Sequence, residues 1–237
     1  MSYALLKPAA FGPVDNYLTI ASDYGDVTTY WQGLDLTVNA RMDNGLTLQG
    51  GFTTGAGTRD ICEITAALPE LLTVAGVQQQ ISSCHVEEPW LWNWRGLANY
   101  IVPKIDVQVS AIFRSQANIA PTNESGSNGA STAANSIVSN AVVSAALGRP
   151  LAGNAQNVTL NLALPGDVYP ERLNTVDMRF SKILRFGGVR SNVGIDLYNL
   201  FNANTGTVFN QNFGATWLTP TSILNARFVR FNATVDF

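Results

Sequence analysis

Seven stretches of this chain alternate apolar and polar residues, and this alternation limits the possible folds more than any other feature of the sequence. In the last stretch, RFVRFNATVDF, the apolar Phe231 and Val235 occupy odd positions, whereas the charged Arg230 and Asp236 occupy even ones. Because successive side chains of a β-strand point to opposite faces, each stretch predicts a strand with one apolar face. The seven stretches are residues 31–42, 46–54, 90–102, 105–115, 172–184, 190–201 and 227–237.

The connections between these stretches alternate between short and long. Asp43-Asn44-Gly45 is a strong signal for a tight hairpin, and short turns are also predicted at 102–104 and 186–188. Long loops are predicted at 56–89, 117–171 and 202–225. Tight turns on one rim and long loops on the other are typical of outer-membrane barrels. The sequence therefore predicts an all-β fold, an antiparallel meander of about seven transmembrane strands with long extracellular loops.

Three local elements are predicted inside the long loops. A short helix is expected near residues 63–72, and a second helix is expected over 136–147, where Gly148 would stop it. The segment 157–162, with the sequence NVTLNL, predicts a short accessory strand.

Composition excludes several classes of protein. Only 13% of the residues are charged, against roughly a quarter in an ordinary soluble domain. The formal net charge of -3 gives no sign of a nucleic-acid surface. No run approaches the roughly 20 apolar residues that a membrane-spanning helix needs, whereas barrel strands conceal their hydrophobicity in alternation.

The residues of the polar face favour a lipid-facing barrel over a soluble fold. Lys and Glu are scarce there, and Asp, Asn, Gln, Ser, Thr and Arg suit a crowded, hydrogen-bonded lumen. Trp90, Trp92 and Trp94 are expected to form an aromatic girdle at one interface, with Tyr100 near the other end of the strand. The alternative is a secreted β-sandwich that binds glycan or protein and uses the tryptophans as a core cluster or a sugar platform.

The C-terminal third resembles a known family. The run RLNTVDMRFSKILRFGGVRSNVGIDLYNLFNANT, with WLTPTSILNARFVRFNATVDF after it, is similar to the C-terminal β-barrel part of a TonB-dependent outer-membrane receptor of the carboxypeptidase-regulatory-like type. Asn199-Leu200-Phe201-Asn202 matches a motif in the penultimate hairpin of such receptors. The resemblance implies a bacterial outer-membrane location and uptake of a scarce nutrient, which could be a siderophore, a vitamin, a saccharide or a peptide.

The resemblance also implies a topology. Phe231, Val235 and Phe237 look like the signal that the outer-membrane assembly machinery reads on the last strand. If Phe237 lies at the periplasm, all three short turns lie there too, and all three long loops lie outside. Residues 1–29 are then expected to be an extracellular loop that leads into the wall, and residues 30–237 a partial barrel.

Receptors of this family have a plug domain, a segment that contacts TonB and about 22 strands. Seven strands are too few, and odd in number, for a closed bacterial barrel. We therefore expect an open C-terminal segment of a larger barrel, with its first and last strands unpaired to each other. Membrane lipid and the assembly machinery are the expected partners, and contact with TonB is expected only through an N-terminal part that this chain lacks.

Cys62 and Cys84 lie in the first long loop, and three states are open to them. A disulfide is favoured by the extracytoplasmic setting, free thiols are a second state, and a metal site with His85 and Glu87 is a third. The sequence shows no Ser-His-Asp order, phosphate-binding loop or paired catalytic carboxylates. We expect neither an enzyme nor a bound cofactor.

Charged residues on the polar face are expected to pair with one another or with a plug inside the lumen. These residues are Asp35, Arg41, Arg95, Asp106, Arg114, Asp177, Arg179, Asp196, Arg230 and Asp236.

Overall fold

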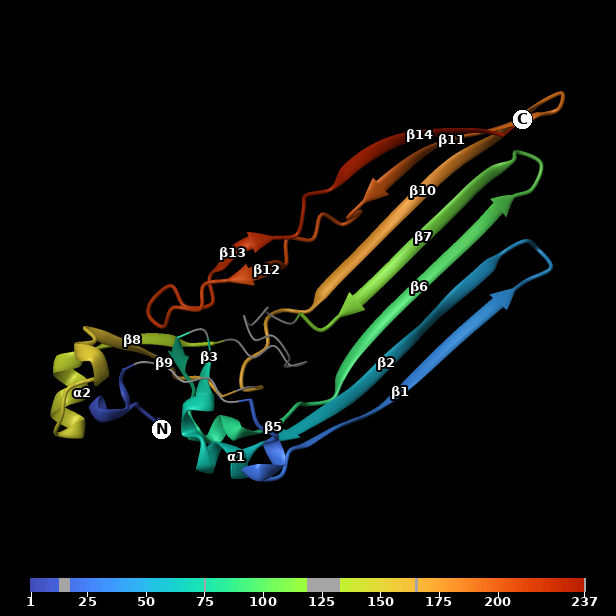
Figure 1. Cartoon of the computed structure of the whole chain (residues 1–237). Coiled ribbons are helices and arrows are strands. Elements are labelled where there is room, and N and C mark those ends of the chain that lie inside the picture. Colours follow the sequence, from blue (N-terminus) through green and yellow to red (C-terminus); the bar gives the residue numbers. More distant parts are fainter. Residues whose placement is uncertain (13–17, 75, 119–132, 165, 237) are drawn as a thin grey trace.

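The computed structural model describes residues 1–12, 18–74, 76–118, 133–164 and 166–236, and a long antiparallel sheet dominates it (Figure 1). Its seven main strands pair in chain order, so the predicted meander is confirmed. A short eighth strand, β5 (His85–Glu87), pairs with the end of the second. The main strands are β1 (Thr28–Arg41), β2 (Thr47–Asp60), β6 (Leu91–Val102), β7 (Val107–Gln116), β10 (Leu173–Phe186), β11 (Val189–Tyr198) and β14 (Phe228–Asp236).

The two ends of the sheet differ, as the connection lengths predict. The tight turns β1/β2, β6/β7 and β10/β11 lie at one end, where β14 also finishes (Figure 1). Gly45 and Gly187 make two of these turns with φ of 86° and 58°, a backbone conformation that glycine adopts without steric cost. The long connections all lie at the opposite end, which we call the loop end.

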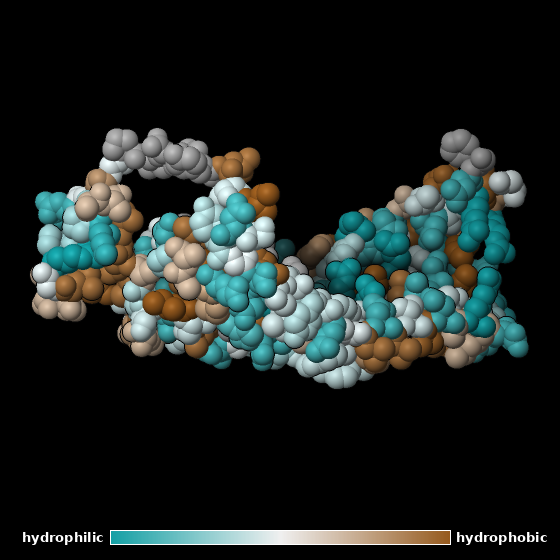
Figure 2. Space-filling view, turned by 60° about the horizontal axis from the view of Figure 1, so that its bottom comes forward, coloured by the Kyte–Doolittle hydropathy of each residue, from teal (hydrophilic) through white to brown (hydrophobic). Residues whose placement is uncertain are grey.

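Strand register places apolar and charged residues on opposite faces. Leu36 faces Phe52, and Phe52 faces Trp94, so one apolar row crosses three strands. Within the seven described main strands, Asp60 and Lys182 are the only charged residues on this outer face. Figure 2 shows hydrophilic residues gathered in the hollow of the sheet and hydrophobic ones along its outer side. The inner face carries Asp35, Arg41, Arg59, Arg95, Arg114, Asp177, Arg179, Arg185, Arg190, Asp196, Arg230 and Asp236.

The sheet is open. β1 and β14 are its two edges, and no pairing joins them among the described residues. Because seven strands alternate in direction, both edges run the same way. The described strands therefore form an antiparallel sheet and do not form a closed barrel.

The long connections fold together at the loop end into a small unit, which we call the cap (described parts of residues 61–90, 117–172 and 199–227). A four-stranded sheet forms its centre, in the order β3-β4-β9-β8. The pair β4–β9 is parallel and joins the first connection to the second. Its strands are β3 (Thr73–Val74), β4 (Val77–Gln78), β8 (Asn135–Ser139) and β9 (Asn157–Asn161), and the hairpin β12 (Gly206–Phe209) and β13 (Pro220–Ile223) belongs to the third connection.

Asn161 is the polar centre of the cap and is almost fully buried. Its Oδ1 accepts hydrogen bonds from the backbone amides of Ala134 and Ala163, at 2.9 and 3.1 Å. Its Nδ2 donates to Oε1 of Gln79 at 2.9 Å, and its carbonyl accepts from the Tyr3 hydroxyl at 2.8 Å. One residue thus ties the N-terminal segment and two long connections together, through its side chain and its backbone carbonyl.

The third connection is held by hydrogen bonds to the second. Trp217 donates its indole N–H to the carbonyl of Ala133 at 3.0 Å, and Asn118 donates to the carbonyl of Gly206 at 2.6 Å. Asn135 exchanges two backbone hydrogen bonds with this connection, through Gln211 and Phe213. The cap is therefore one packed unit and not three independent loops.

Strand boundaries differ from those predicted. β1 begins at Thr28, inside the segment 1–29, and β2 continues to Asp60, inside the loop 56–89. Both extensions have backbone partners, because Thr28 faces Asp60 and β5 covers the other edge of β2. The Gly55-Ala56-Gly57 run looks like a strand breaker in sequence, but long-range pairing keeps it extended.

Helices in the cap are shorter than predicted. α1 spans Cys62–Ala67, and Pro69 restarts the chain as a 3-10 turn, η3 (Pro69–Leu72), because the residue before proline avoids helical geometry. Residues 135–139 form β8 where a helix was expected, and α2 (Asn140–Leu147) follows and ends at Gly148 as predicted. The remaining 3-10 turns are η1 (Pro8–Ala10), η2 (Ala21–Asp23), η4 (Ile81–Cys84) and η5 (Ala152–Asn154). Across the described residues, the helices are too short or too polar to cross a membrane.

The buried Asn161 side chain gives a test of the cap. Asn161→Ala leaves two buried amides without acceptors, so the free energy of unfolding of the cap should fall by about 2 kcal/mol. Amide hydrogen exchange of β8 and β9 measures this loss. Asn157→Ala, at the exposed start of β9, is the matched control. Equal protection in the two variants would contradict the assigned role of Asn161.

Candidate functional site

Three charged side chains meet at one level of the inner face. Arg179 of β10, Asp196 of β11 and Arg230 of β14 are directly opposed in register. Arg179 donates from Nε and Nη2 to the two carboxylate oxygens at 2.5 and 3.0 Å. Arg230 donates from Nε and Nη2 to Oδ2 at 3.0 and 2.8 Å. The Asp196 side chain is only 5% exposed, whereas both guanidiniums stay about half exposed.

The arrangement has an excess of one positive charge and unused donors facing the hollow of the sheet. Arg230 also lies over the ring of Tyr198, 5.3 Å from its centroid, and Tyr198 stacks on Phe228 at 4.5 Å. Planar guanidinium groups of this kind suit carboxylate or phosphate ligands and the faces of aromatic rings. The chemistry of this arrangement suits an anionic or polar solute.

The Asn199-Leu200-Phe201-Asn202 motif has a structural role at the end of β11. Asn199 and Asn202 adopt left-handed backbone geometry, with φ of 50° and 53°, which asparagine tolerates. Asn199 exchanges hydrogen bonds with the backbone of Ala203 and donates to the carbonyl of Asn225. Asn202 accepts from the amide of Arg227 at 2.8 Å. The motif therefore fixes the chain where it leaves one strand and enters the next.

Other predicted inner-face charges are paired loosely or not at all. Arg95 lies 3.9 Å from Asp35, and Arg185 lies 3.7 Å from Asp106, which sits in the β6/β7 turn. Asp177 accepts the backbone amide of Asn199. No ion-pair partner for Arg41, Arg114 or Asp236 is found in the part of the chain that the structure describes.

Three of the four aromatic residues predicted as a girdle, Trp90, Trp92 and Trp94, lie toward the loop end. The ring of Phe52 lies 5.4 Å from that of Trp92 and 4.8 Å from that of Trp94, centroid to centroid. Trp90 is exposed and precedes β6, and Tyr100 shares the outer face of β6 near the turn end. Contact of these four residues with a membrane stays a prediction. The tryptophans lie at one end of β6 and Tyr100 lies near the other, as two separate interfaces would require.

The predicted assembly signal lies on an open edge. Phe231 and Val235 are on the outer face of β14, where they are 78% and 54% exposed. Phe237 lies outside the described residues.

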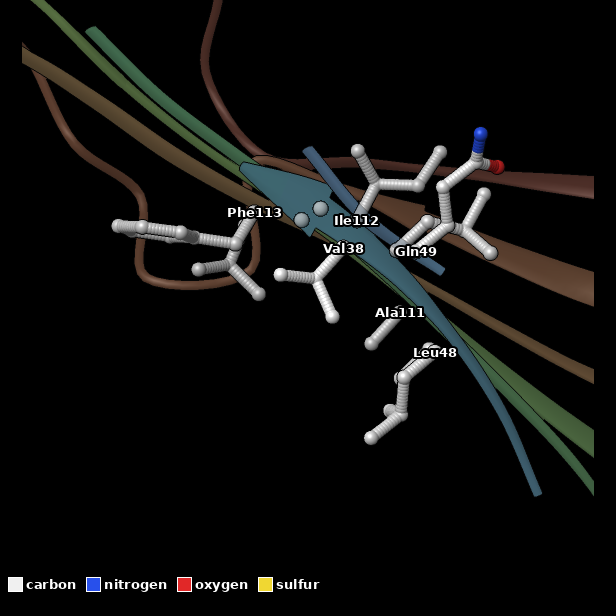
Figure 3. Close-up of a pocket in the computed structure, with 11 residues that line it drawn as sticks. Val38, Leu48, Gln49, Ala111, Ile112 and Phe113 are labelled. Carbon is white, nitrogen blue, oxygen red and sulfur yellow. The ribbon is translucent and has the colours of Figure 1, made fainter. Parts of the chain in front are cut away.

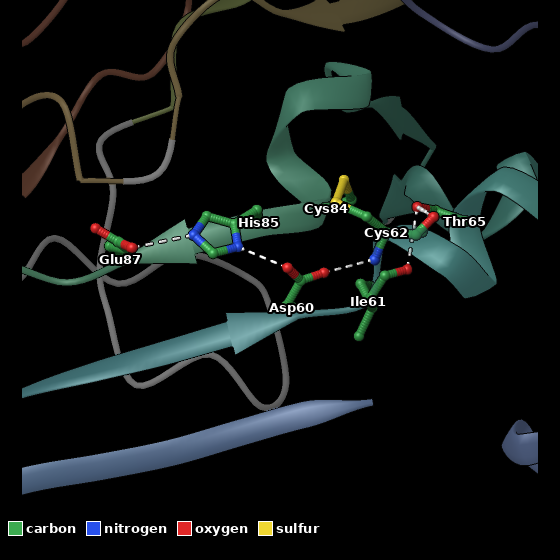
Figure 4. Close-up of polar contacts among 7 residues, drawn as sticks. All are labelled: Asp60, Ile61, Cys62, Thr65, Cys84, His85 and Glu87. Atoms are coloured by element: carbon green, nitrogen blue, oxygen red, sulfur yellow. Dashed lines mark hydrogen bonds and ion pairs between the residues drawn. A yellow bond between two sulfur atoms is a disulfide. The ribbon is translucent and has the colours of Figure 1, made fainter. Parts of the chain in front are cut away.

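A clip at the loop end joins β2, β5 and α1 (Figure 4). Cys62 and Cys84 are linked by a disulfide, with their Cα atoms 4.8 Å apart. Asp60 accepts the amide of Cys62 at 2.9 Å and lies 2.8 Å from Nδ1 of His85. Nε2 of His85 lies 3.2 Å from Glu87. No cluster suited to a metal ion is found among the described residues, and the cysteine thiolates that such a site needs are consumed.

The hydrogen bond from Asp60, and then that from Glu87, raises the pKa of His85 above its ordinary value. The pKa of Asp60 is lowered by the Cys62 amide and then by His85. Asp60 and His85 both lie closer to the cap than Thr54 and Trp92, which face each other near the loop end of the β2–β6 pairing. The ionic clip is complete between these pKa values, because acid protonates Asp60 and alkali neutralises His85.

Sequence patterns did not single out Arg172. It precedes β10 on the outer face and donates from Nε to Oγ of Ser115 at 2.8 Å. The available signal was its spacing from Lys182: the two residues are ten positions apart and therefore share one face of the strand.

Comparison with known proteins identifies no relative: no family model, curated protein or solved structure matches this chain.

Removing the shared carboxylate should destabilise the sheet. Asp196→Asn leaves two adjacent guanidiniums without their counter-charge, and we expect a loss of about 2 kcal/mol, below the range for a fully buried pair because both arginines are half exposed. Thermal unfolding in detergent micelles, followed by circular dichroism, measures it. Asp35→Asn is the control, since its side chain is 54% exposed. An equal loss in both variants would show that the Asp196 contacts stabilise the sheet no more than an exposed carboxylate does.

His85 is the only histidine in the sequence, so its titration can be followed without overlap. We expect its ring signals in NMR to titrate above the ordinary histidine range. Asp60→Asn should lower that pKa more than Glu87→Gln does, because Asp60 makes the larger contribution. An unchanged pKa in Asp60→Asn would contradict the clip.

Proposed function

We propose that this chain forms part of the wall of a bacterial outer-membrane transporter of the TonB-dependent receptor type, with the cap outside the cell and the tight turns at the periplasm. The observation that carries the proposal is the segregation of charge: twelve charged residues on the inner face of the main strands and two on the outer. A soluble protein has no reason to keep charge off an exposed face, whereas lipid penalises it strongly.

The limits of the uncharged band match a bilayer. On the outer face of β10, Arg172 lies just before the strand and Lys182 follows ten residues later. Ten residues of strand span about 33 Å, or about 25 Å along the membrane normal at a tilt near 40°. That height is close to the apolar band of known outer-membrane barrels, and the girdle tryptophans lie at its upper limit.

The position of the second sheet disfavours the sandwich alternative. A β-sandwich buries one face of each sheet against the other at about 10 Å. The four-stranded sheet here lies beyond the end of the large one and leaves its outer face uncovered (Figure 1). Val38, Val193 and Ile195 are accordingly 56%, 47% and 40% exposed.

On this proposal the inner face lines the transport path. The Arg179–Asp196–Arg230 group and the neighbouring Tyr198 ring present donors and an aromatic face to the lumen. A siderophore, a vitamin, a saccharide or a peptide could be the solute, and the cap would contact it first. The sheet edges would be completed by further strands, since unpaired backbone groups are costly in lipid.

Lysine scanning of the two faces tests the proposal. Leu197→Lys places a charge near the middle of the uncharged band, because Leu197 faces Met178 on the outer side. This charge should cost about 2–4 kcal/mol in lipid, so little protein expressed from its native gene should remain in carbonate-washed outer membranes. Thr234→Lys, on the inner face, is the matched control and should be recovered like the unaltered protein. Recovery of the unaltered protein in the soluble fraction would overturn the proposal in favour of a secreted module.

A further inference from the structure

The outer face is hollowed where two glycines meet. Gly50 of β2 and Gly96 of β6 face each other in register and form the floor of a depression of about 390 Å³. Val38 and Phe113 border it and point to the outer side, whereas Ile112 points to the inner side (Figure 3). Almost all of its lining is apolar.

Missing side chains create this hollow. A Cβ placed on Gly96 would meet no atom within 4 Å, so the space above that residue is open. A Cβ on Gly50 would come within 2.9 Å of the Arg95 carbonyl oxygen, so the paired backbones already lie close together. The hollow can therefore be filled from Gly96 without disturbing the sheet.

A fixed cation lies one row of side chains beyond the hollow, toward the loop end. Arg172 donates from Nε to Oγ of Ser115 at 2.8 Å, and from Nη2 to the carbonyls of Ser115 and Trp92. Ser115 faces Trp94 on one side and Asn174 on the other. Among the described residues, Nη1 has no hydrogen-bond partner and no carboxylate lies within 4.0 Å of the guanidinium.

The cation and the hollow have the order and the spacing of a lipid molecule. From Ser115 to Phe113 is about 7 Å along the strand, and to Ala111 about 13 Å. A lipid whose anionic headgroup contacts Arg172 at the membrane surface would place its acyl chain at these depths. A free phosphate would gain nothing from the apolar hollow, whereas a lipid engages both parts.

We propose that Arg172 and the Gly50–Gly96 hollow bind one phosphate-bearing lipid of the leaflet at the loop end. The phosphate contacts the Arg172 guanidinium, and one acyl chain lies in the hollow between Val38 and Phe113. This proposal rests on the proposed function, because it requires the outer face to meet lipid.

Photolabelling tests the site. The membrane-inserted protein is illuminated in phosphatidylcholine vesicles that contain 2-acyl diazirine phosphatidic acid, and labelled residues are mapped by mass spectrometry. Label should concentrate on the residues that line the hollow. Arg172→Gln should reduce that labelling about fivefold, the effect of one cation at an anionic surface. Gly96→Leu should displace the label from the hollow, and Lys182→Gln, at the opposite interface, should leave it unchanged.

The outcomes separate the two proposals. Uniform labelling of the outer face that does not depend on Arg172 would overturn the lipid site and leave the proposed function intact. Absence of label from the outer face would overturn both. Competition by 10-fold excess inorganic phosphate would show that Arg172 binds a free anion and would overturn the lipid assignment, whereas resistance to phosphate supports it.

Discussion

The separation of charge between the two faces of one meander is the constraint on which the rest of the structure depends. Side-chain parity in a strand fixes the face of every residue, so the outer face of seven strands can stay almost free of charge only if each register is kept. A slip of one residue at β11–β14 would move Phe231 inward and Arg230 outward. The Arg179–Asp196–Arg230 contacts oppose this slip, since they form only in the observed register.

The cap supplies a second constraint, on the connections. Loops of this length would ordinarily cost entropy to order, and buried hydrogen bonds from Asn161, together with the Cys62–Cys84 link, offset that cost. The β2–β5 pairing, which ends at the Asp60–His85 contact, carries the large sheet into the cap. The large sheet and the cap are thus joined through β2 as well as through the connections themselves.

Local periodicity made the strands and their faces predictable, because alternation along a chain needs no knowledge of partners. Features that depend on distant partners were not predictable. The parallel β4–β9 pair joins only two residues of each strand. The sequence of β8 was interpreted as part of a helix, and β2 was expected to end near its glycines. Asp196 was identified as an inner-face charge. Its partner Arg179 lies across the tight β10/β11 hairpin, whereas Arg230 follows from a register that the 199–227 connection sets. Arg172 was missed because only pairing places it beside Ser115.

Strand parity also limits how the edges can be completed. β1 and β14 run in the same direction, so a second copy placed edge to edge in the same orientation would meet this one in a parallel seam. An odd number of additional strands between the two edges would keep every pair antiparallel, and such a wall would contain an even total, as bacterial outer-membrane barrels do. An antiparallel seam at these edges therefore needs strands other than a second copy of these seven.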